Sequence, residues 1–408
     1  MESAKLRIKP FSLFDRDLLN RSFSRIGLDS RRASHLALRS LIVIGLTWVP
    51  MAVLAYWQRL YSIHVDARNF FADYAAYAQF LIAIPLFIVG ERIISSSTLR
   101  ADKDFVESGV VRDEDRPTVD SLHAEVERLR LSRVAEAVCI ALAYVTASAT
   151  ILPELTTHSI LTWHTGSGPG GNVQTFLGLT APGAWALLVA LPILNYWWLR
   201  IAWKIIIWTR YLYGMSRLKL VLVASHPDST GGIGFISEVQ STFAVIIFAY
   251  GISNVAAVIA YKVAIEHAPL SLMPVWAPAL GFIVCAPLLF TLPLLMFTKQ
   301  LSRTKHRAVA LCRAQLLRRT QAFETRSLNE DLSVGAGSDS AWLASMNNLN
   351  GIFERIEQMR VVPFDFKSAT QLLASTIGSV ATALPLLKFQ GPLKEWLELL
   401  SSVMRHGS

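Results

Sequence analysis

Long runs of apolar residues are the dominant pattern along this chain. A helix that crosses a lipid bilayer needs about 17 to 25 mostly apolar residues, and six runs reach that length. The predicted spans cover approximately residues 41–57, 74–94, 134–152, 182–208, 243–263 and 276–297. A weaker run at 369–387 is uncharged but contains several Ser, Thr and Gln residues. The pattern predicts an all-α polytopic membrane helix bundle with six or seven transmembrane helices.

The composition supports a membrane protein. Charged residues make up 17% of the 408 residues and the mean hydropathy is +0.40, whereas soluble domains contain about 25% charged residues. The first apolar run begins far from the N terminus, and no small-residue cleavage site follows it. We therefore expect this run to be a retained helix and not a signal peptide.

Lys and Arg are concentrated in alternate connections between the spans. The segments before the first span, between the second and third, and after the sixth are basic, whereas residues 153–181 contain no Lys or Arg. Short basic connections stay in the cytosol, so we expect a cytosolic N terminus. The net charge of +9 then lies mainly at the face that meets anionic lipid headgroups, and we expect no nucleic-acid partner.

These patterns divide the chain into four regions. Residues 1–40 form a cytosolic basic amphipathic arm, 41–298 the transmembrane domain, and 299–362 a cytosolic helical region. Residues 363–408 hold a seventh or re-entrant helix and an amphipathic tail. In the third region, an apolar stripe at helical spacing is expected to pack on another helix of this chain or of a partner subunit. The stripe consists of Trp342, Met346, Leu349, Phe353, Ile356 and Met359.

Two cytosolic helices are predicted between the second and third spans. The first should end at Gly109, since Gly commonly terminates a helix. The second should begin near Asp115 and Pro117, because Pro suits the first helical turn. We expect this second helix to continue into the third span.

The most specific local feature lies between the fourth and fifth spans, where residues 226–235 read His-Pro-Asp-Ser-Thr-Gly-Gly-Ile-Gly-Phe. Gly231, Gly232 and Gly234 allow positive φ and close backbone approach. Backbone N–H groups at such a turn, before a helix, form a natural anion site. With His226 and Asp228, the loop is predicted to be a cytosolic gate or anion loop. The alternative is a tight turn that redirects the chain into the fifth span.

Two further segments accompany this loop. Residues 105–117 read Phe-Val-Glu-Ser-Gly-Val-Val-Arg-Asp-Glu-Asp-Arg-Pro, and residues 359–365 read Met-Arg-Val-Val-Pro-Phe-Asp. With these three motifs in order, the chain resembles a family of uncharacterised bacterial multi-pass inner-membrane proteins. The resemblance covers most of the chain and implies a location in the bacterial inner membrane. It carries no activity, cofactor or functional residue over to this sequence.

Polar side chains within the spans are candidates for a solute path, because such groups are costly in a membrane. Asn195 and Asn254 lie within predicted spans, and Arg200 and Lys204 share one face of the fourth. We predict that these four residues line a pore or substrate path. The alternatives are that the Asn residues bond between helices, and that Arg200 and Lys204 extend to the inner interface.

Acidic residues are rare in the spans, which argues against a carboxylate relay for protons or sodium. Glu91 and Glu136 lie near predicted cytosolic ends, and we expect them to form ion pairs with the nearby Arg92 and Arg133. Several prolines can kink the spans, namely Pro85, Pro192, Pro287 and Pro293.

Catalytic and metal chemistry is poorly represented. Cys139, Cys285 and Cys312 have no zinc-like spacing, and neither a nucleophile elbow nor an HExxH motif occurs. We therefore expect no cofactor, no metal and no catalytic residues, and the sequence argues against an enzyme.

Three functions are consistent with these patterns. The first is a channel or facilitative transporter for ions or small solutes, including anions. The second is a sensor or scaffold without a pore that binds a cytosolic partner or forms a homo-oligomer. The third is a membrane-embedded enzyme that acts on lipid headgroups at His226 and Asp228.

Overall fold

A computed structural model gives the fold of the chain. It describes residues 11, 13–14, 18–28, 32–61, 70–156, 163–165, 178–255, 258, 273–329 and 336–382. These residues form helices, apart from connecting loops and one isolated β-bridge between Thr165 and Leu179. In chain order the α-helices are α1 (Leu18–Arg25), α2 (Ala33–Tyr61), α3 (Tyr74–Tyr77), α4 (Ile84–Glu107), α5 (Arg116–Arg130), α6 (Arg133–Thr156), α7 (Ala181–Trp185), α8 (Leu191–Arg217), α9 (Phe235–Thr242), α10 (Ala244–Tyr250), α12 (Met273–Thr291), α13 (Thr298–Asn329), α14 (Ala336–Glu357) and α15 (Phe366–Ala381).

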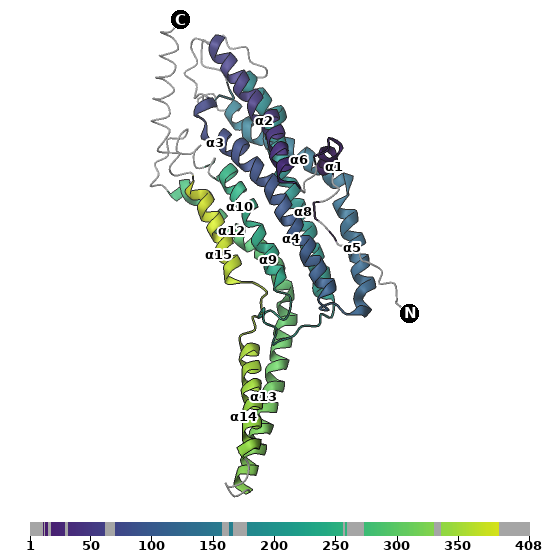
Figure 1. The fold of residues 1–408 in the computed structure, drawn as a ribbon. Coiled ribbons are helices and arrows are strands. Elements are labelled where there is room, and N and C mark those ends of the chain that lie inside the picture. Colours follow the sequence, from purple (N-terminus) through teal and green to yellow (C-terminus); the bar gives the residue numbers. More distant parts are fainter. Residues whose placement is uncertain are drawn as a thin grey trace.

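Within the described residues, 6 helical stretches are long and apolar enough to cross a membrane. They cover Ala33–Gln58, Ala75–Glu107, Asp113–Leu152, Ala181–Arg217, Phe235–Val255 and Trp276–Thr325. The stretches form a bundle, and α13 and α14 project from one end of it, which we call the stalk end (Figure 1). The predicted all-α polytopic membrane helix bundle is therefore confirmed.

The outward faces of several helices are apolar. Val134 of α6 is 75% exposed, Leu41 of α2 is 63% exposed and Leu289 of α12 is 59% exposed. Contiguous apolar surface of this kind is unusual on soluble monomers, whereas lipid tails solvate it. These faces are the ones that meet the hydrocarbon of the bilayer.

Two of the membrane-compatible stretches widen into a π-helical turn just before a proline. The turn η2 (Ala78–Ala83) precedes Pro85 of α4, and η4 (Ala186–Ala190) precedes Pro192 of α8. Proline has no N–H to donate, and its ring clashes with the carbonyl group four residues earlier. The helix accommodates each proline by adding a residue to the preceding turn.

The helix that precedes the third span does not continue into it, contrary to the sequence-based expectation. α5 ends at Arg130 and α6 begins at Arg133, so Leu131 and Ser132 form an elbow between them. The Ser132 hydroxyl accepts a hydrogen bond from the N–H of Ala135 at 3.3 Å, which caps the start of α6. Both helices pack along α8, one on each side of the elbow.

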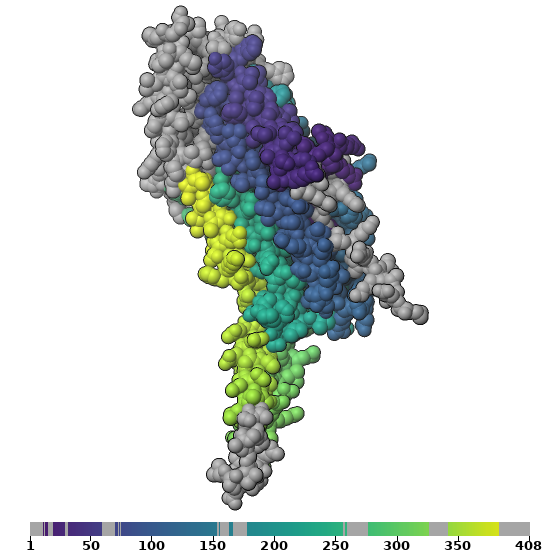
Figure 2. All heavy atoms as spheres, in the orientation of Figure 1, coloured from purple at the N-terminus to yellow at the C-terminus, as the bar shows by residue number. Residues whose placement is uncertain are grey.

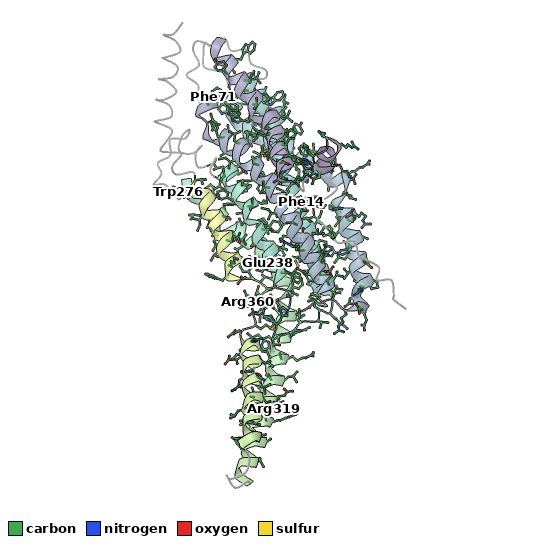
Figure 3. The ribbon with its side chains drawn as sticks, in the orientation of Figure 1. Phe14, Phe71, Glu238, Trp276, Arg319 and Arg360 are labelled. Atoms are coloured by element: carbon green, nitrogen blue, oxygen red, sulfur yellow. The ribbon has the colours of Figure 1, made fainter. Side chains whose placement is uncertain are left out.

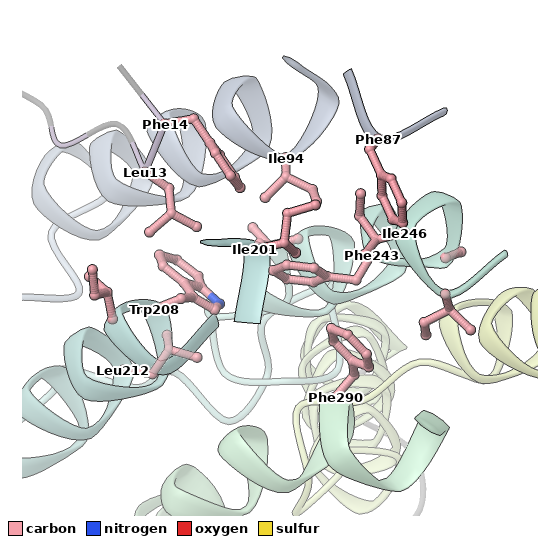
Figure 4. Close-up of a cluster of buried hydrophobic side chains, with 14 of the residues drawn as sticks. Leu13, Phe14, Phe87, Ile94, Ile201, Trp208, Leu212, Phe243, Ile246 and Phe290 are labelled. Atoms are coloured by element: carbon pink, nitrogen blue, oxygen red, sulfur yellow. The ribbon is translucent and has the colours of Figure 1, made fainter. Parts of the chain in front are cut away.

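Large apolar side chains fill the interior between α4, α8, α9, α10 and η6 (Leu292–Phe297). The rings of Phe243 and Phe290 lie 5.0 Å apart between their centroids. Figure 4 shows the cluster around them, which includes Phe87, Ile94, Ile201, Trp208, Leu212 and Ile246. Leu13 and Phe14, from the N-terminal segment, pack into the same cluster.

The stalk is an antiparallel hairpin of α13 and α14 (Figure 1). The apolar stripe of α14 faces α13, and Trp342 stacks on Phe323 with 4.0 Å between ring centroids. At the base, Lys305 Nζ donates to the carbonyl oxygens of Glu357 and Met359, each at 2.7 Å. Of the two partners predicted for the stripe, the structure therefore provides a helix of the same chain.

α15 returns from the stalk and lies against the bundle beside α9 and α10 (Figure 2). It packs closely on η5 (Gly251–Val255), where a Cβ atom at Gly251 would overlap Ser379. The predicted seventh segment at 369–387 corresponds to α15 up to Ala381. The end of that segment and the predicted amphipathic tail fall within 383–408, outside the described residues.

Candidate functional site

A buried ion pair joins α4 and α8. Arg200 Nη1 donates to Glu91 Oε1, and Trp197 Nε1 donates to the same oxygen at 2.7 Å. Glu91 is 6% exposed and Arg200 is 4% exposed, and buried charges of this kind persist only when they are paired. The sequence predicts a pair between Glu91 and Arg92, its neighbour in the chain. The structure pairs it with Arg200 because the buried face of α4 carries Glu91 toward α8.

A cavity lies next to this ion pair, between the α5–α6 elbow and α8. Lys204, one turn beyond Arg200, is 2% exposed, and its Nζ lies 3.5 Å from the carbonyl oxygen of Arg130. The space measures about 300 Å³ including the part open to the outside, and about 20 Å³ of it admits the centre of a water molecule. We call it the elbow cavity. Its lining consists of Arg130, Ser132, Glu136, Cys139, Tyr196, Arg200, Trp203 and Lys204.

Polar partners engage Arg130 and Glu136, two of the charged residues of the elbow cavity. Arg130 Nη2 lies 2.6 Å from both carboxylate oxygens of Glu127. Glu136 Oε1 accepts a hydrogen bond from the Tyr196 hydroxyl at 2.8 Å. The ion pair predicted between Glu136 and Arg133 does not form between these two described residues, because Glu136 turns toward α8 instead. The described part of the lining carries the cations Arg130, Arg200 and Lys204 and the carboxylate of Glu136.

Helix length places the elbow cavity near one edge of the hydrocarbon layer. Arg200 follows Pro182 by 18 residues, which corresponds to a helical rise of about 27 Å. The hydrocarbon core of a bilayer is about 30 Å thick, and α7 begins at the end of the bundle opposite the stalk (Figure 1). With Pro182 taken as the start of the span, this rise brings Arg200 and Lys204 to the stalk-side edge of that layer.

A buried carboxylate nearer the stalk end fixes the N-terminal segment. Asp102 Oδ1 lies 2.6 Å from the Tyr211 hydroxyl and 2.7 Å from His123 Nε2, and its Oδ2 accepts from the N–H of Phe11 at 2.7 Å. The Phe11 ring stacks on Tyr211 with 5.8 Å between centroids, and the Arg200 guanidinium lies 5.5 Å from the ring centre of Phe14. Phe11, Leu13 and Phe14 of the 1–40 arm are thus buried against α4, α5 and α8.

The 226–235 loop is organised around the carboxylate of Asp228. Its Oδ1 accepts from the N–H of Thr230 at 2.8 Å, and its Oδ2 accepts from Gly232 at 3.0 Å and Gly234 at 2.9 Å. The turn requires φ of +71° at Gly231 and +98° at Gly232, values that L side chains rarely adopt. The backbone donors predicted to bind an external anion are therefore engaged by the chain's own carboxylate, and the geometry is that of a tight turn.

The same contacts set the charge of Asp228. Partial burial alone would raise the pKa of this carboxyl group, but hydrogen bonds from Thr230, Gly234 and His226 lower it to about 2. His226 Nδ1 lies 2.8 Å from Asp228 Oδ1. The carboxylate is therefore ionised near neutral pH and acts as a hydrogen-bond acceptor in the loop.

The three motifs singled out in the sequence converge at the base of the stalk. Just before the loop, Val221 N–H donates to the carbonyl oxygen of Val110 at 2.8 Å. Arg360 N–H donates to the carbonyl oxygen of Ser229 at 2.7 Å, and Arg360 Nη2 donates to that of Asp228 at 3.2 Å. Figure 3 shows Arg360 at the narrow connection between bundle and stalk. We call the meeting point of residues 105–117, 226–235 and 359–365 the stalk junction.

The structure brings some of the predicted path residues together. Arg200 and Lys204 share the elbow cavity, and Asn195 lies partly buried on the same helix, toward the opposite end from the stalk. Asn254 lies in η5, which packs on η2, α12 and α15. Its side chain donates to Ser253 Oγ at 2.7 Å, within its own helix.

Several polar contacts were not foreseen from the sequence. The Glu91–Arg200 pair could have been found from opposite charges in two different predicted spans. The cluster of Asp102, His123 and Tyr211 gives no local signal, because its members lie on three helices and are far apart in the chain.

Within the described residues, no group of three or more His, Cys, Asp and Glu side chains is arranged to hold a metal ion. No protein-family model matches the chain, and neither a curated protein nor a solved structure shows significant similarity to it. The chain is a multi-pass helical membrane protein whose function must be argued from its own residues.

Proposed function

We propose that this protein is a channel or facilitative transporter for ions or small anionic solutes. The path would pass between α4, α6 and α8, beside Arg200 and Lys204. The observation that carries the proposal is the burial of Glu91, Arg200 and Lys204, each at most 6% exposed, on membrane-compatible helices. Ionisable groups at such positions are costly and commonly mark ion or substrate pathways.

The arrangement of charge supports anions as the transported species. Among the residues that the structure describes, three cations and one carboxylate line the elbow cavity, and cationic linings attract anions. Apolar side chains fill the interior in Figure 4, so transport would require α6 or α8 to move. The elbow at Leu131 and Ser132 and the π turn η4 provide points at which these helices can bend.

The distribution of basic residues supports an orientation. Lys and Arg gather in the connections at the stalk end, and basic connections face the cytosol. We place the stalk end in the cytosol, and the resemblance described above supports the bacterial inner membrane as the location.

Current across a planar bilayer under asymmetric salt tests this function. Purified protein should give discrete currents whose reversal potential lies toward the equilibrium potential of the anion, or it should support uptake of an anionic solute into liposomes. Lys204→Gln should reduce the anion preference, while Lys204→Arg should retain it. Arg210→Gln is the matched control, because Arg210 also lies on α8 but pairs with Glu125 at 2.9 Å outside the cavity. Folded and inserted protein that passes neither current nor solute would overturn the proposal.

A second candidate function is a membrane-anchored scaffold, and the stalk favours it. The outer face of α13 exposes Leu311 and Leu317, at 63% and 60%, among exposed arginines. Because the stripe of α14 is already covered by α13, a partner would bind this outer face. Replacing both leucines with Glu should release a specific partner from the full-length protein while the bundle stays folded. A wild-type protein that conducts and purifies alone would remove this candidate.

A further inference from the structure

We propose that the outer face of α13 is a docking surface for an acidic amphipathic helix of another protein. The inference rests on the second candidate function above, because it names the chemical class of the partner that the stalk would bind. It also holds for a protein that conducts, since the stalk projects clear of the bundle (Figures 1 and 2).

The helical period divides α13 into two opposite faces. Lys305 and Arg319 donate hydrogen bonds to α14 or to the residues just after it, and Cys312 between them is 7% exposed. An α-helix turns by about 100° per residue, so the face opposite these three residues can be read from the sequence. It carries a seam of six exposed residues, alternately four and three positions apart, which we call the outer seam. The outer seam consists of Arg303, Arg307, Ala310, Ala314, Leu317 and Gln321.

The middle of the outer seam is apolar. Leu317 is 60% exposed, and Leu311 at its edge is 63% exposed. Ala310 and Ala314 are short side chains that let another helix approach closely. Alternation by four and three residues is the spacing at which one helix packs along another. The seam covers 18 residues of rise, about 27 Å, so a partner helix could follow it for several turns.

The charge of α13 selects the chemistry of the partner. The helix contains eight Lys and Arg residues and one Glu. Arg303 and Arg307 lie on the outer seam toward the base of the stalk, and Arg318 lies beside Leu317; all three are exposed. Charged residues that flank an apolar seam determine which helices pair. A complementary helix therefore carries Asp or Glu beside its own apolar positions.

The same charges disfavour a second copy of this chain as the occupant. Copies inserted in one membrane with the same orientation hold their stalks parallel. Equal positions meet in a parallel helix pair, so Arg303 would face Arg303 and Arg307 would face Arg307. Like charges in contact oppose such a pairing.

Lipid and nucleic acid fit the outer seam less well than a protein helix. With Phe297 taken as the end of the span, Leu311 and Leu317 lie about 21 Å and about 30 Å farther along the helix axis. The headgroup region extends only about 5–8 Å beyond the hydrocarbon on each side. Single-stranded nucleic acid stacks on aromatic side chains, but Phe323, the aromatic residue of α13, already stacks on Trp342.

Binding of a synthetic peptide tests the chemistry of the surface. The probe is a fluorescein-labelled helical peptide of 21 residues with Leu or Ala at the seam positions and Glu at the flanking positions. One control peptide has Lys in place of Glu, and a second has the acidic composition in scrambled order. Fluorescence anisotropy is measured with the full-length protein in phosphatidylcholine nanodiscs, and empty nanodiscs give the background.

We expect the acidic amphipathic peptide to bind at least tenfold more tightly than either control peptide. Leu317→Ser and Arg307→Gln should each weaken its binding at least fivefold. The matched controls are Leu343→Ser and Arg355→Gln, because both residues are exposed on α14, and these variants should bind as the wild type does. Equal binding of the scrambled peptide, or full binding by Leu317→Ser, would overturn the proposal.

Photocrosslinking tests the partner in the cells that naturally produce the protein. Benzoylphenylalanine takes the place of Ala314 in one variant and of Leu343 in the control. A crosslink from position 314 to an acidic amphipathic helix of another protein supports the proposal. Crosslinks from 314 to a second copy or to nucleic acid, or no crosslink beyond that from 343, would overturn it.

Flux measurements separate this inference from the proposed transport. Leu317→Ser should leave the flux of the purified protein unchanged, because Leu317 lies outside the bundle. Peptide binding by a protein without flux supports the docking surface and removes the channel. Flux in a protein that does not discriminate among the peptides supports the channel and removes the docking surface.

Discussion

The buried pair between Glu91 and Arg200 makes the sharpest prediction about the bundle. Arg200→Gln removes the cationic partner of the Glu91 carboxylate, which stays at 6% exposure and keeps the Trp197 N–H as a donor. Breaking a buried ion pair by removing one partner typically costs about 3–5 kcal/mol of stability. We therefore expect the free energy of unfolding to fall by this amount. Glu91→Gln should cost a similar amount, because it leaves the Arg200 guanidinium buried without its carboxylate.

The double variant decides whether the pair accounts for these losses. When Glu91 and Arg200 are both replaced by Gln, neither charge of the pair remains without the other, and the new amide on α4 can still accept a hydrogen bond from Trp197. Replacing both members of a buried ion pair is often neutral, so most of the lost stability should return. Thermal unfolding in detergent, followed by tryptophan fluorescence, provides the measurement. A double variant as unstable as the sum of the single variants would refute the pairing.

Two further predictions concern the loop and α15. Asp228 has its pKa lowered from 3.8 to about 2, so its stabilisation of roughly 2 kcal/mol is complete above about pH 4 and is lost as the pH falls toward 2. Asp228→Asn should therefore speed hydrogen exchange of the Gly232 and Gly234 amides at neutral pH. It should also remove the increase in their exchange that acid causes in the wild-type protein. Amides that stay protected from exchange in the variant would contradict the loop geometry. Gly251→Ala introduces a Cβ that overlaps Ser379, and we expect it to cost about 1–3 kcal/mol in a thermal unfolding assay. Ser379→Gly should restore that loss in the double variant, and an unchanged melting temperature for Gly251→Ala alone would show that α15 does not pack there.

Local signals in the sequence predicted much of the fold. Apolar runs of the required length gave the membrane-compatible helices, because the bilayer fixes the length of a spanning helix. Gly109 has φ of +76° just beyond α4, and Pro117 lies in the first turn of α5, both as expected from their backbone preferences. These features depend on neighbours in the chain and can be inferred without a structure.

Contacts between distant segments could not be predicted in the same way. The partner of Glu91 depends on which face of α4 turns toward α8, and this rotation is set by the packing of the whole bundle. The loop at 226–235 was predicted to offer its N–H groups to an external anion, whereas Asp228 lies close enough in sequence to fill that place itself. An attached carboxylate competes at a high effective concentration, so the internal acceptor is favoured.

The stalk junction also determines how a displacement would travel through the molecule. α13 has 32 residues, a length of about 48 Å, and most of it lies beyond the contacts that Lys305 and Arg360 make at its base. Because Arg360 joins the end of the stalk to the Asp228 loop, a displacement of the stalk would act on that loop. α9 and α15 begin at Phe235 and Phe366, within a few residues of the stalk junction. A displacement of the stalk would therefore reach α9 and α15 through the stalk junction.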